Sequence, residues 1–348
     1  MPDAAPDLLT SLLRDVSRSF YLTLWILPSS VRRPIGLAYL LARATDTIAD
    51  TALLPAAERL EALEALRARI LGRRTTPLDF QRLAAAQPAQ ASPAERVLLG
   101  RVEEAITVLD GLPDSDAAEI RAVLETITGG QALDLRRFGH LEPAHPGSGV
   151  LRVEALPGEA ELDDYTYRVA GCVGEFWSRI CRRRLFPDAP LEEPGWIADG
   201  IRFGKGLQLV NILRDLPRDL RLGRCYLPAD GLARLGLAPA ALLDPAAETR
   251  LRPLYDAWLA RADQHLEAGW RYVAALPRDQ RRVRLACAWP ILIGARTLAR
   301  LRAGPVLDPA VRHKIPRREV RALVGSTVAR LPRPRAWARL LEDARRPG

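Results

Sequence analysis

Two stretches of the chain decide the fold: GLAYLLARATDTIAD at residues 36–50 and GKGLQLVNILRDLPRDLRLGRCYLP at residues 204–228. Each combines apolar residues at helical spacing with two aspartates four positions apart. These pairs are Asp46 with Asp50 and Asp215 with Asp219. Residues four apart share one face of an α-helix, where like charges cost an isolated helix roughly 0.2–0.5 kcal/mol. Because carboxylates in apolar helices need partners, the pairs predict that a cation binds between them.

The second stretch indicates a further oxygen ligand. Asn211 is the only asparagine in the 348 residues and precedes Asp215 by four positions, and Gln208 lies on the same helical face. Mg²⁺ suits such ligands, since proteins usually hold it with one or two carboxylates and substrate phosphate oxygens. The alternative is a solvated helix face on which Arg214 and Arg218 pair with the aspartates. The apolar flanks favour the metal site.

Composition and charge restrict the partners. The chain is 48% hydrophobic and 27% charged, which is typical of a soluble globular protein. Its net charge of +9 suits an anionic partner, either a diphosphate, an anionic membrane surface or nucleic acid. A nucleic-acid binder does not explain carboxylate pairs in apolar helices, so we expect no nucleic-acid partner. The four cysteines form no C-x-x-C pair, which argues against a zinc site or a disulfide framework.

The ends and the apolar runs indicate where the protein works. The N-terminus lacks the basic start and apolar core of a signal peptide. The longest apolar runs are too short or too interrupted by proline to cross a bilayer. We therefore expect a cytoplasmic protein. The basic amphipathic residues 331–348 favour peripheral contact with the inner face of the membrane.

Helices are predicted along nearly the whole chain, and strands are not, because period-two runs of β-branched residues are absent. Ser29 and Ser30 offer an N-cap for the helix with the first aspartate pair, and Pro28 ends the helix before it. Together the helices predict one all-α domain over residues 1–348. The predicted helices span 7–26, 31–51, 56–71, 94–110, 114–138, 161–184, 193–221, 246–275, 279–301 and, with breaks, 316–345.

Three blocks resemble, in order and spacing, the signature blocks of the squalene/phytoene synthase family. They are residues 17–51, residues 162–180 with the pattern Y-x-Y-x-V-A-G, and residues 206–228. The resemblance covers about residues 11–300 and implies the isoprenoid synthase fold, a helical bundle around a central apolar cavity. It implies a prenyltransferase of isoprenoid biosynthesis. Such an enzyme joins two prenyl diphosphates head to head, through a cyclopropyl diphosphate, using Mg²⁺.

The resemblance also assigns site residues, position by position. The implied metal ligands are Asp46, Asp50, Asn211, Asp215 and Asp219. The implied catalytic residues are Tyr39, Arg43, Tyr165 and Arg214. The implied substrate-binding residues are Ser17, Arg18, Ser19, Phe20, Gln208, Asn211, Arg218 and Arg224.

The two tyrosines, and two glycines of the second block, also have an ordinary structural interpretation. Tyr165 is the candidate base that removes a proton to close the cyclopropane, with Tyr39 or the diphosphate assisting. Each tyrosine could instead be a half-buried core residue. Gly171 and Gly174 would either leave room for prenyl chains in the cavity wall or allow close helix packing.

Short sequence patterns are the basis for predicting which reaction of the family the chain catalyses. The stretch DTIAD resembles that of squalene synthases, whereas NILRDLPRD followed by GRCYLP resembles bacterial phytoene and presqualene diphosphate synthases. We expect squalene formation from two farnesyl diphosphates, with reduction by NADPH, for which no binding residue is assigned. Two alternatives remain open: a presqualene diphosphate synthase that stops at the first half-reaction, and a phytoene synthase that uses geranylgeranyl diphosphate. The Y-x-Y-x-V-A-G block argues against a class I terpene cyclase.

Overall fold

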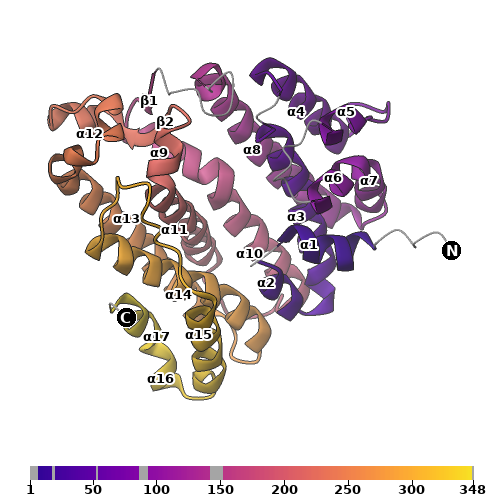
Figure 1. The fold of residues 1–348 in the computed structure, drawn as a ribbon. Helices are drawn as coiled ribbons and strands as arrows, with labels where there is room; N and C mark the ends of the chain where they lie inside the picture. Colours follow the sequence, from indigo (N-terminus) through magenta and orange to yellow (C-terminus); the bar gives the residue numbers. More distant parts are fainter. Residues whose placement is uncertain (1–6, 18–19, 52–53, 86–92, 142–151, 347–348) are drawn as a thin grey trace. The chain divides into compact units, whose positions relative to one another are not determined.

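The computed structural model describes residues 7–17, 20–51, 54–85, 93–141 and 152–346. In these residues the chain is almost entirely helical, so the predicted all-α class is confirmed (Figure 1).

The chain divides into two compact units. The first unit consists of residues 1–140 and 179–187, and the second of residues 141–178 and 188–348. Whether the two act as the one domain that the sequence predicts stays a prediction.

The first unit is built around two long helices, α3 and α8, which pack against each other and against α4. Its elements are the π-helix η1 (Leu8–Leu12), α1 (Leu13–Ser17), α2 (Tyr21–Ile26), α3 (Ser29–Ala49), α4 (Ala56–Ile70), α5 (Gln81–Ala85), α6 (Pro93–Gly100), α7 (Val102–Asp110), α8 (Asp114–Phe138) and the short 3-10 turn η3 (Gly139–Leu141). The last residue of η3, Leu141, belongs to the second unit.

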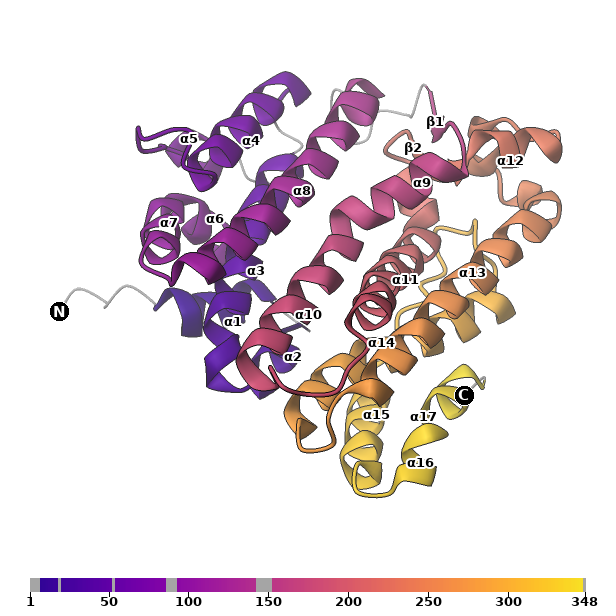
Figure 2. The ribbon, with the colours of Figure 1, turned by 180° about the vertical axis from the view of Figure 1, so that it is seen from behind.

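The second unit is built around α11, which packs chiefly against α13 and also against α14 (Figure 2). Its elements are β1 (Glu154–Leu156), α9 (Glu159–Thr166), the π-helical turn η4 (Tyr167–Gly171), α10 (Cys172–Leu185), α11 (Glu193–Leu220), β2 (Arg224–Pro228), α12 (Ala229–Arg234), the 3-10 turns η5 (Pro239–Leu243) and η6 (Pro245–Ala247), α13 (Glu248–Ala275), α14 (Arg281–Ala303), α15 (Arg317–Arg330), α16 (Pro334–Ala338) and α17 (Leu340–Arg345). The last residues of α10, 179–185, belong to the first unit.

The start of α3 differs from the prediction. Pro28, at φ −54° and ψ 144°, occupies the cap position, and the helix begins at Ser29 without a side-chain cap. The predicted serine cap is wrong because the proline ring already fixes the extended backbone that must precede a helix. The apolar face of α3 is buried as its spacing predicts, with Val31, Ile35 and Ile48 at 0–4% exposure.

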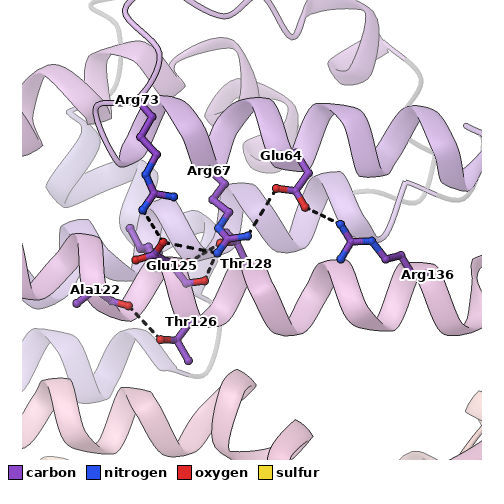
Figure 3. Close-up of polar contacts among 9 residues, drawn as sticks. Glu64, Arg67, Arg73, Ala122, Glu125, Thr126, Thr128 and Arg136 are labelled. Atoms are coloured by element: carbon purple, nitrogen blue, oxygen red, sulfur yellow. Dashed lines mark hydrogen bonds and ion pairs between the residues drawn. The ribbon is translucent and has the colours of Figure 1, made fainter.

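Ion pairs join α4 and the turn after it to α8 (Figure 3). Glu64 lies 3.0 Å from Arg136 and 3.6 Å from Arg67, while Glu125 lies 2.7 Å from Arg73 and 3.7 Å from Arg67. Arg67 therefore links both acids. Partly exposed pairs of this kind contribute less than about 1 kcal/mol each, so they align α4 on α8 more than they stabilise it.

In the second unit the helices approach so closely that glycine is required. A Cβ added at Gly174 would lie 2.0 Å from the carbonyl oxygen of Gly200, and one added at Gly204 would lie 2.2 Å from that of Ala170. The turn η4 and α10 therefore pack on α11 with backbone against backbone. Of the two roles expected for Gly174, close helix packing is confirmed.

A short parallel sheet was not predicted. Glu154 and Ala155 of β1 pair with Arg224 and Cys225 of β2, and the register is irregular before Leu156. The prediction of no strands is wrong here because four of the five β2 residues are buried, which leaves no alternation of apolar and polar residues to detect.

Most predicted helices are confirmed, with differences at their ends. The stretch 94–110 forms two helices, α6 and α7, which meet at Arg101 directly after Gly100, a weak helix former. The stretch 246–275 becomes helical only at Glu248, after the turns η5 and η6. The helices that the structure describes include none with the length and apolarity needed to span a bilayer.

Candidate active site

The first aspartate pair stands at the C-terminal end of α3. Asp46 lies in the last turn and Asp50 is the C-cap residue, whose N–H still donates to the Asp46 carbonyl at 2.9 Å. The two carboxylates are therefore one helical turn apart. No basic residue lies in this last turn, and negative charge at a helix C-terminus opposes the helix dipole. Two carboxylates at this position therefore favour the binding of a cation.

Asp46 is held from two sides. The Gln131 amide Nε2 on α8 donates to its Oδ1, and Arg43 Nη1 lies 3.9 Å from its Oδ2. Desolvation and then the charge on Asp50 raise the pKa of Asp46 to about 7, against the opposing effects of Arg43 and Gln131. The Asp46 side chain still keeps 47% of its surface accessible. Its pKa is raised even so, because the negative charge of Asp50 stands one turn away. A cation can therefore reach a carboxylate that its neighbours do not neutralise.

Arg43 pairs mainly with another helix. Its Nη2 donates to Oε1 of Glu95 on α6, a residue that is 6% exposed. The Arg43 guanidinium is thus shared between Glu95 and Asp46, with the closer contact to Glu95. Sequence reasoning missed both Glu95 and Gln131. Their only signal is a polar residue on the buried face of a helix.

The residues of the first signature block lie in or near the same unit's α1 to α3. The Tyr39 ring stacks on Phe20 with centroids 5.2 Å apart. Ser17 is buried and its hydroxyl donates to the Leu13 carbonyl. Arg18 and Ser19 lie outside the described residues. The substrate-binding and catalytic roles of this block stay predictions.

The second aspartate pair lies on α11, in the second unit. Arg214 Nε and Nη2 donate to Asp215 Oδ1 and Oδ2 at 2.9 and 2.6 Å, and this pairing is the first cause of the raised pKa of Arg214. Arg214 thus pairs with its neighbour in the chain, Asp215, and the choice between a metal site and a solvated helix face stays a prediction. Asn211 and Arg218 are exposed, while Gln208 and Asp219 are partly buried.

Pro217 lies between the two aspartates, inside α11. Because proline has no N–H, the carbonyl of Leu213 loses its regular helical donor. The hydroxyl of Tyr255, a fully buried residue of α13, donates to that carbonyl at 2.9 Å. Burial raises the pKa of Tyr255, so the hydroxyl stays protonated and can donate. A side chain of α13 thus supplies the donor that α11 lacks at Leu213, just before the two acids.

We expect Tyr255→Phe to lower the free energy of unfolding by about 1–2 kcal/mol, because it leaves a buried carbonyl without a donor. Pro217→Ala restores an N–H that can reach the Leu213 carbonyl. Urea denaturation of both single variants and the double variant measures the coupling. If Tyr255→Phe lowers the free energy of unfolding equally in the parent and in the Pro217→Ala variant, this account is contradicted.

Tyr165 comes from α9 and stacks on Tyr226 of β2, with ring centroids 4.9 Å apart and planes 18° apart. Tyr226 is 6% exposed, and Arg224, at the start of β2, is partly buried. The unpredicted strand β2 thus carries both the ring that stacks on Tyr165 and the predicted substrate-binding residue Arg224. The role of Tyr165 as a base stays a prediction.

A sequence model of the squalene/phytoene synthase family matches residues 13–319. The chain belongs to the squalene/phytoene synthase family and is a prenyltransferase, in a family whose members condense prenyl diphosphates head to head.

Several relatives and solved structures resemble the chain. A presqualene diphosphate synthase of Zymomonas mobilis subsp. mobilis is 30% identical over 75% of this chain and 73% of that protein. A 15-cis-phytoene synthase of Synechocystis sp. is 28% identical over 79% and 68%. The structure of TcSQS with the ligand E5700 matches with a TM-score of 0.73 at 20% identity, covering 96% of this chain and 87% of that one. Squalene synthase HpnC from Alicyclobacillus acidocaldarius matches with a TM-score of 0.56 at 19% identity, over 84% and 92%. At these identities the structures establish the fold.

Proposed function

We propose that the protein catalyses the Mg²⁺-dependent head-to-head condensation of two farnesyl diphosphates to presqualene diphosphate. The observation that carries this proposal is the accessible Asp46 carboxylate, which stands one turn from Asp50 and is held by a neutral amide. The similarity of the chain to the Zymomonas presqualene diphosphate synthase supports the choice of substrate and product.

The donor set fits Mg²⁺. The described residues contain no group of three or more His, Cys, Asp or Glu that could hold a metal ion by themselves. Two carboxylates per motif leave coordination positions for water and substrate phosphate oxygens, which is how Mg²⁺ usually binds. Asp46 and Asp50 would hold one site, and Asp215, Asp219 and Asn211 the other. Bound Mg²⁺ would neutralise charge on the departing diphosphate.

Other residues would act on the substrate itself. The guanidinium groups of Arg43 and Arg214 can donate to diphosphate oxygens, which are strong acceptors. The ring of Tyr165 can stabilise a nearby carbocation without reacting with it. Its hydroxyl is the candidate acceptor for the proton lost on cyclopropane closure. An apolar cavity that excludes water from the cation is part of this proposal.

A second candidate is the full conversion to squalene, favoured by the DTIAD pattern at residues 46–50. That reaction needs a hydride, which NADPH would supply, and we assign no residue to NADPH. Phytoene formation from geranylgeranyl diphosphate is the third candidate, supported by the similarity to the Synechocystis phytoene synthase.

One product assay separates these reactions. Purified protein is incubated with farnesyl diphosphate and Mg²⁺, with and without NADPH, and the products are identified by mass spectrometry. Presqualene diphosphate under both conditions supports the first proposal, and squalene only with NADPH supports the second. Phytoene from geranylgeranyl diphosphate, with no product from farnesyl diphosphate, would replace both. Absence of any product, or product formation in excess EDTA, would overturn Mg²⁺-dependent condensation.

A further inference from the structure

Two buried polar residues from different helices meet the same turn of α3. Gln131 of α8 donates to Asp46, and Glu95 of α6 accepts from Arg43, three positions before Asp46. Gln131 is 8% exposed and Glu95 is 6% exposed, so both residues are more than nine-tenths buried. Buried polar groups in a helical core are costly unless they make such contacts. Their convergence on one turn indicates a shared purpose.

The contact with Glu95 changes what Arg43 can do. Arg43 forms an ion pair with Asp46, yet its Nη1 stands 3.9 Å from the carboxylate, while its Nη2 donates to Glu95. A direct, bidentate pair would occupy both Asp46 oxygens, as Arg214 occupies those of Asp215. Arg43 therefore does not occupy the Asp46 oxygens, whereas both Asp215 oxygens accept hydrogen bonds from Arg214.

The contact with Gln131 orients Asp46 without neutralising it. A carboxylate only accepts hydrogen bonds, so the Gln131 amide nitrogen must face Asp46. The other amide atom, Oε1, is buried and has no hydrogen-bond partner among the described residues. An unsatisfied buried amide oxygen is unfavourable, so only the N–H end of the Gln131 amide has a favourable contact. Its N–H fixes the carboxylate while leaving its negative charge available.

We propose that Gln131 and Glu95 are positioning residues of the first metal site: Glu95 draws Arg43 away from Asp46, and Gln131 orients the Asp46 carboxylate, so that Asp46 stays open to a divalent cation. This inference rests on the proposed function, because it assigns the cation to the Asp46 and Asp50 pair. Outer-shell partners of metal ligands commonly change metal affinity by about 10–100-fold when they are replaced.

The test measures metal binding directly, by titrating full-length protein with Mn²⁺ in the presence of inorganic pyrophosphate and following free Mn²⁺ by electron paramagnetic resonance. An Asp215→Asn, Asp219→Asn background isolates the first motif. In that background we expect Gln131→Leu to weaken Mn²⁺ binding by about tenfold. We expect Glu95→Gln to weaken it at least about threefold, since the Arg43 charge is then free to turn to Asp46.

Charge rescue separates positioning from packing. Adding Arg43→Gln to Glu95→Gln removes the cation that Glu95 restrains. In a titration without pyrophosphate, which Arg43 would itself bind, Mn²⁺ affinity is expected to recover, which a purely structural role would not produce. Thr128→Val on α8 and Glu103→Gln, which breaks the 2.9 Å pair with Arg69, are matched controls that should leave binding unchanged. Gln131→Met retains the length of the side chain and serves if the leucine variant does not fold.

The possible outcomes separate a failure of the proposed function from a failure of the positioning roles of Gln131 and Glu95. If the parent protein with pyrophosphate does not bind Mn²⁺, the proposed function loses its metal site. If the parent binds Mn²⁺ and the folded Gln131 and Glu95 variants bind it equally well, the proposed function stands and the positioning roles are overturned.

Discussion

Gly204→Ala and Gly174→Ala are each expected to lower the free energy of unfolding by about 3 kcal/mol or more. The new Cβ would lie 2.2 Å from the carbonyl oxygen of Ala170 in the first variant and 2.0 Å from that of Gly200 in the second. A crowded side chain can change rotamer, but here the obstacle is backbone, so whole helices must separate. The gain in helix propensity from alanine, about 1 kcal/mol, is too small to offset this.

Urea denaturation followed by circular dichroism measures the effect, and Gly325→Ala is the control. Gly325 also lies in a helix, α15, but a Cβ there would meet no atom of the described residues within 4 Å. That variant is expected to be unchanged or more stable by up to about 1 kcal/mol. If Gly204→Ala unfolds at the same urea concentration as the parent, the backbone contact between η4 and α11 is not as close as the structure has it.

Asp50→Asn and Asp215→Asn are each expected to reduce turnover of farnesyl diphosphate at least about 100-fold. Asparagine keeps the size of the side chain but removes the charge that would hold Mg²⁺ against the diphosphate, and loss of one such electrostatic contact typically costs this much. The free energy of unfolding, in contrast, is expected to rise in Asp50→Asn. That substitution removes a like charge one turn from Asp46 and a negative charge from a helix C-terminus.

Steady-state product formation, with Mg²⁺ in excess, measures the loss. Asp199→Asn is the matched control for Asp215→Asn, because Asp199 is on the same helix and pairs only at the surface, with Arg271 at 2.7 Å. It should keep turnover within about threefold, since surface ion pairs contribute little. A folded Asp50→Asn variant with the turnover of the parent would remove the first motif from the proposed mechanism.

The sequence was sufficient for features with local causes. Apolar periodicity located the long helices, and the four-residue spacing of Asp46 and Asp50 placed both acids on one turn of α3. The strand β2 could not be predicted, since its pairing partner lies about 70 residues earlier and its own residues do not alternate. The break at Arg101 and the proline cap of α3 are errors of one or two residues that depend on local backbone geometry.

The missed site residues share a different cause. Gln131 lies 85 residues from Asp46 and Glu95 lies 52 residues from Arg43, so no spacing rule in one sequence connects them. Tyr255 is likewise 42 residues from the Leu213 carbonyl. Local pattern identifies which residues carry the charge, whereas contacts between distant helices decide how that charge is oriented.

The bond between Tyr255 and Leu213 has a consequence for the order of folding. At Pro217 the helix α11 cannot complete its own ladder of hydrogen bonds, so the part that carries Asp215 and Asp219 depends on a hydroxyl from α13. The N-terminal part of α11 can form from local interactions alone, but its last turns gain their missing donor only when α13 docks. The hydrogen bonding of the second acidic motif is thus completed by a tertiary contact, which couples completion of the helix to its packing against α13.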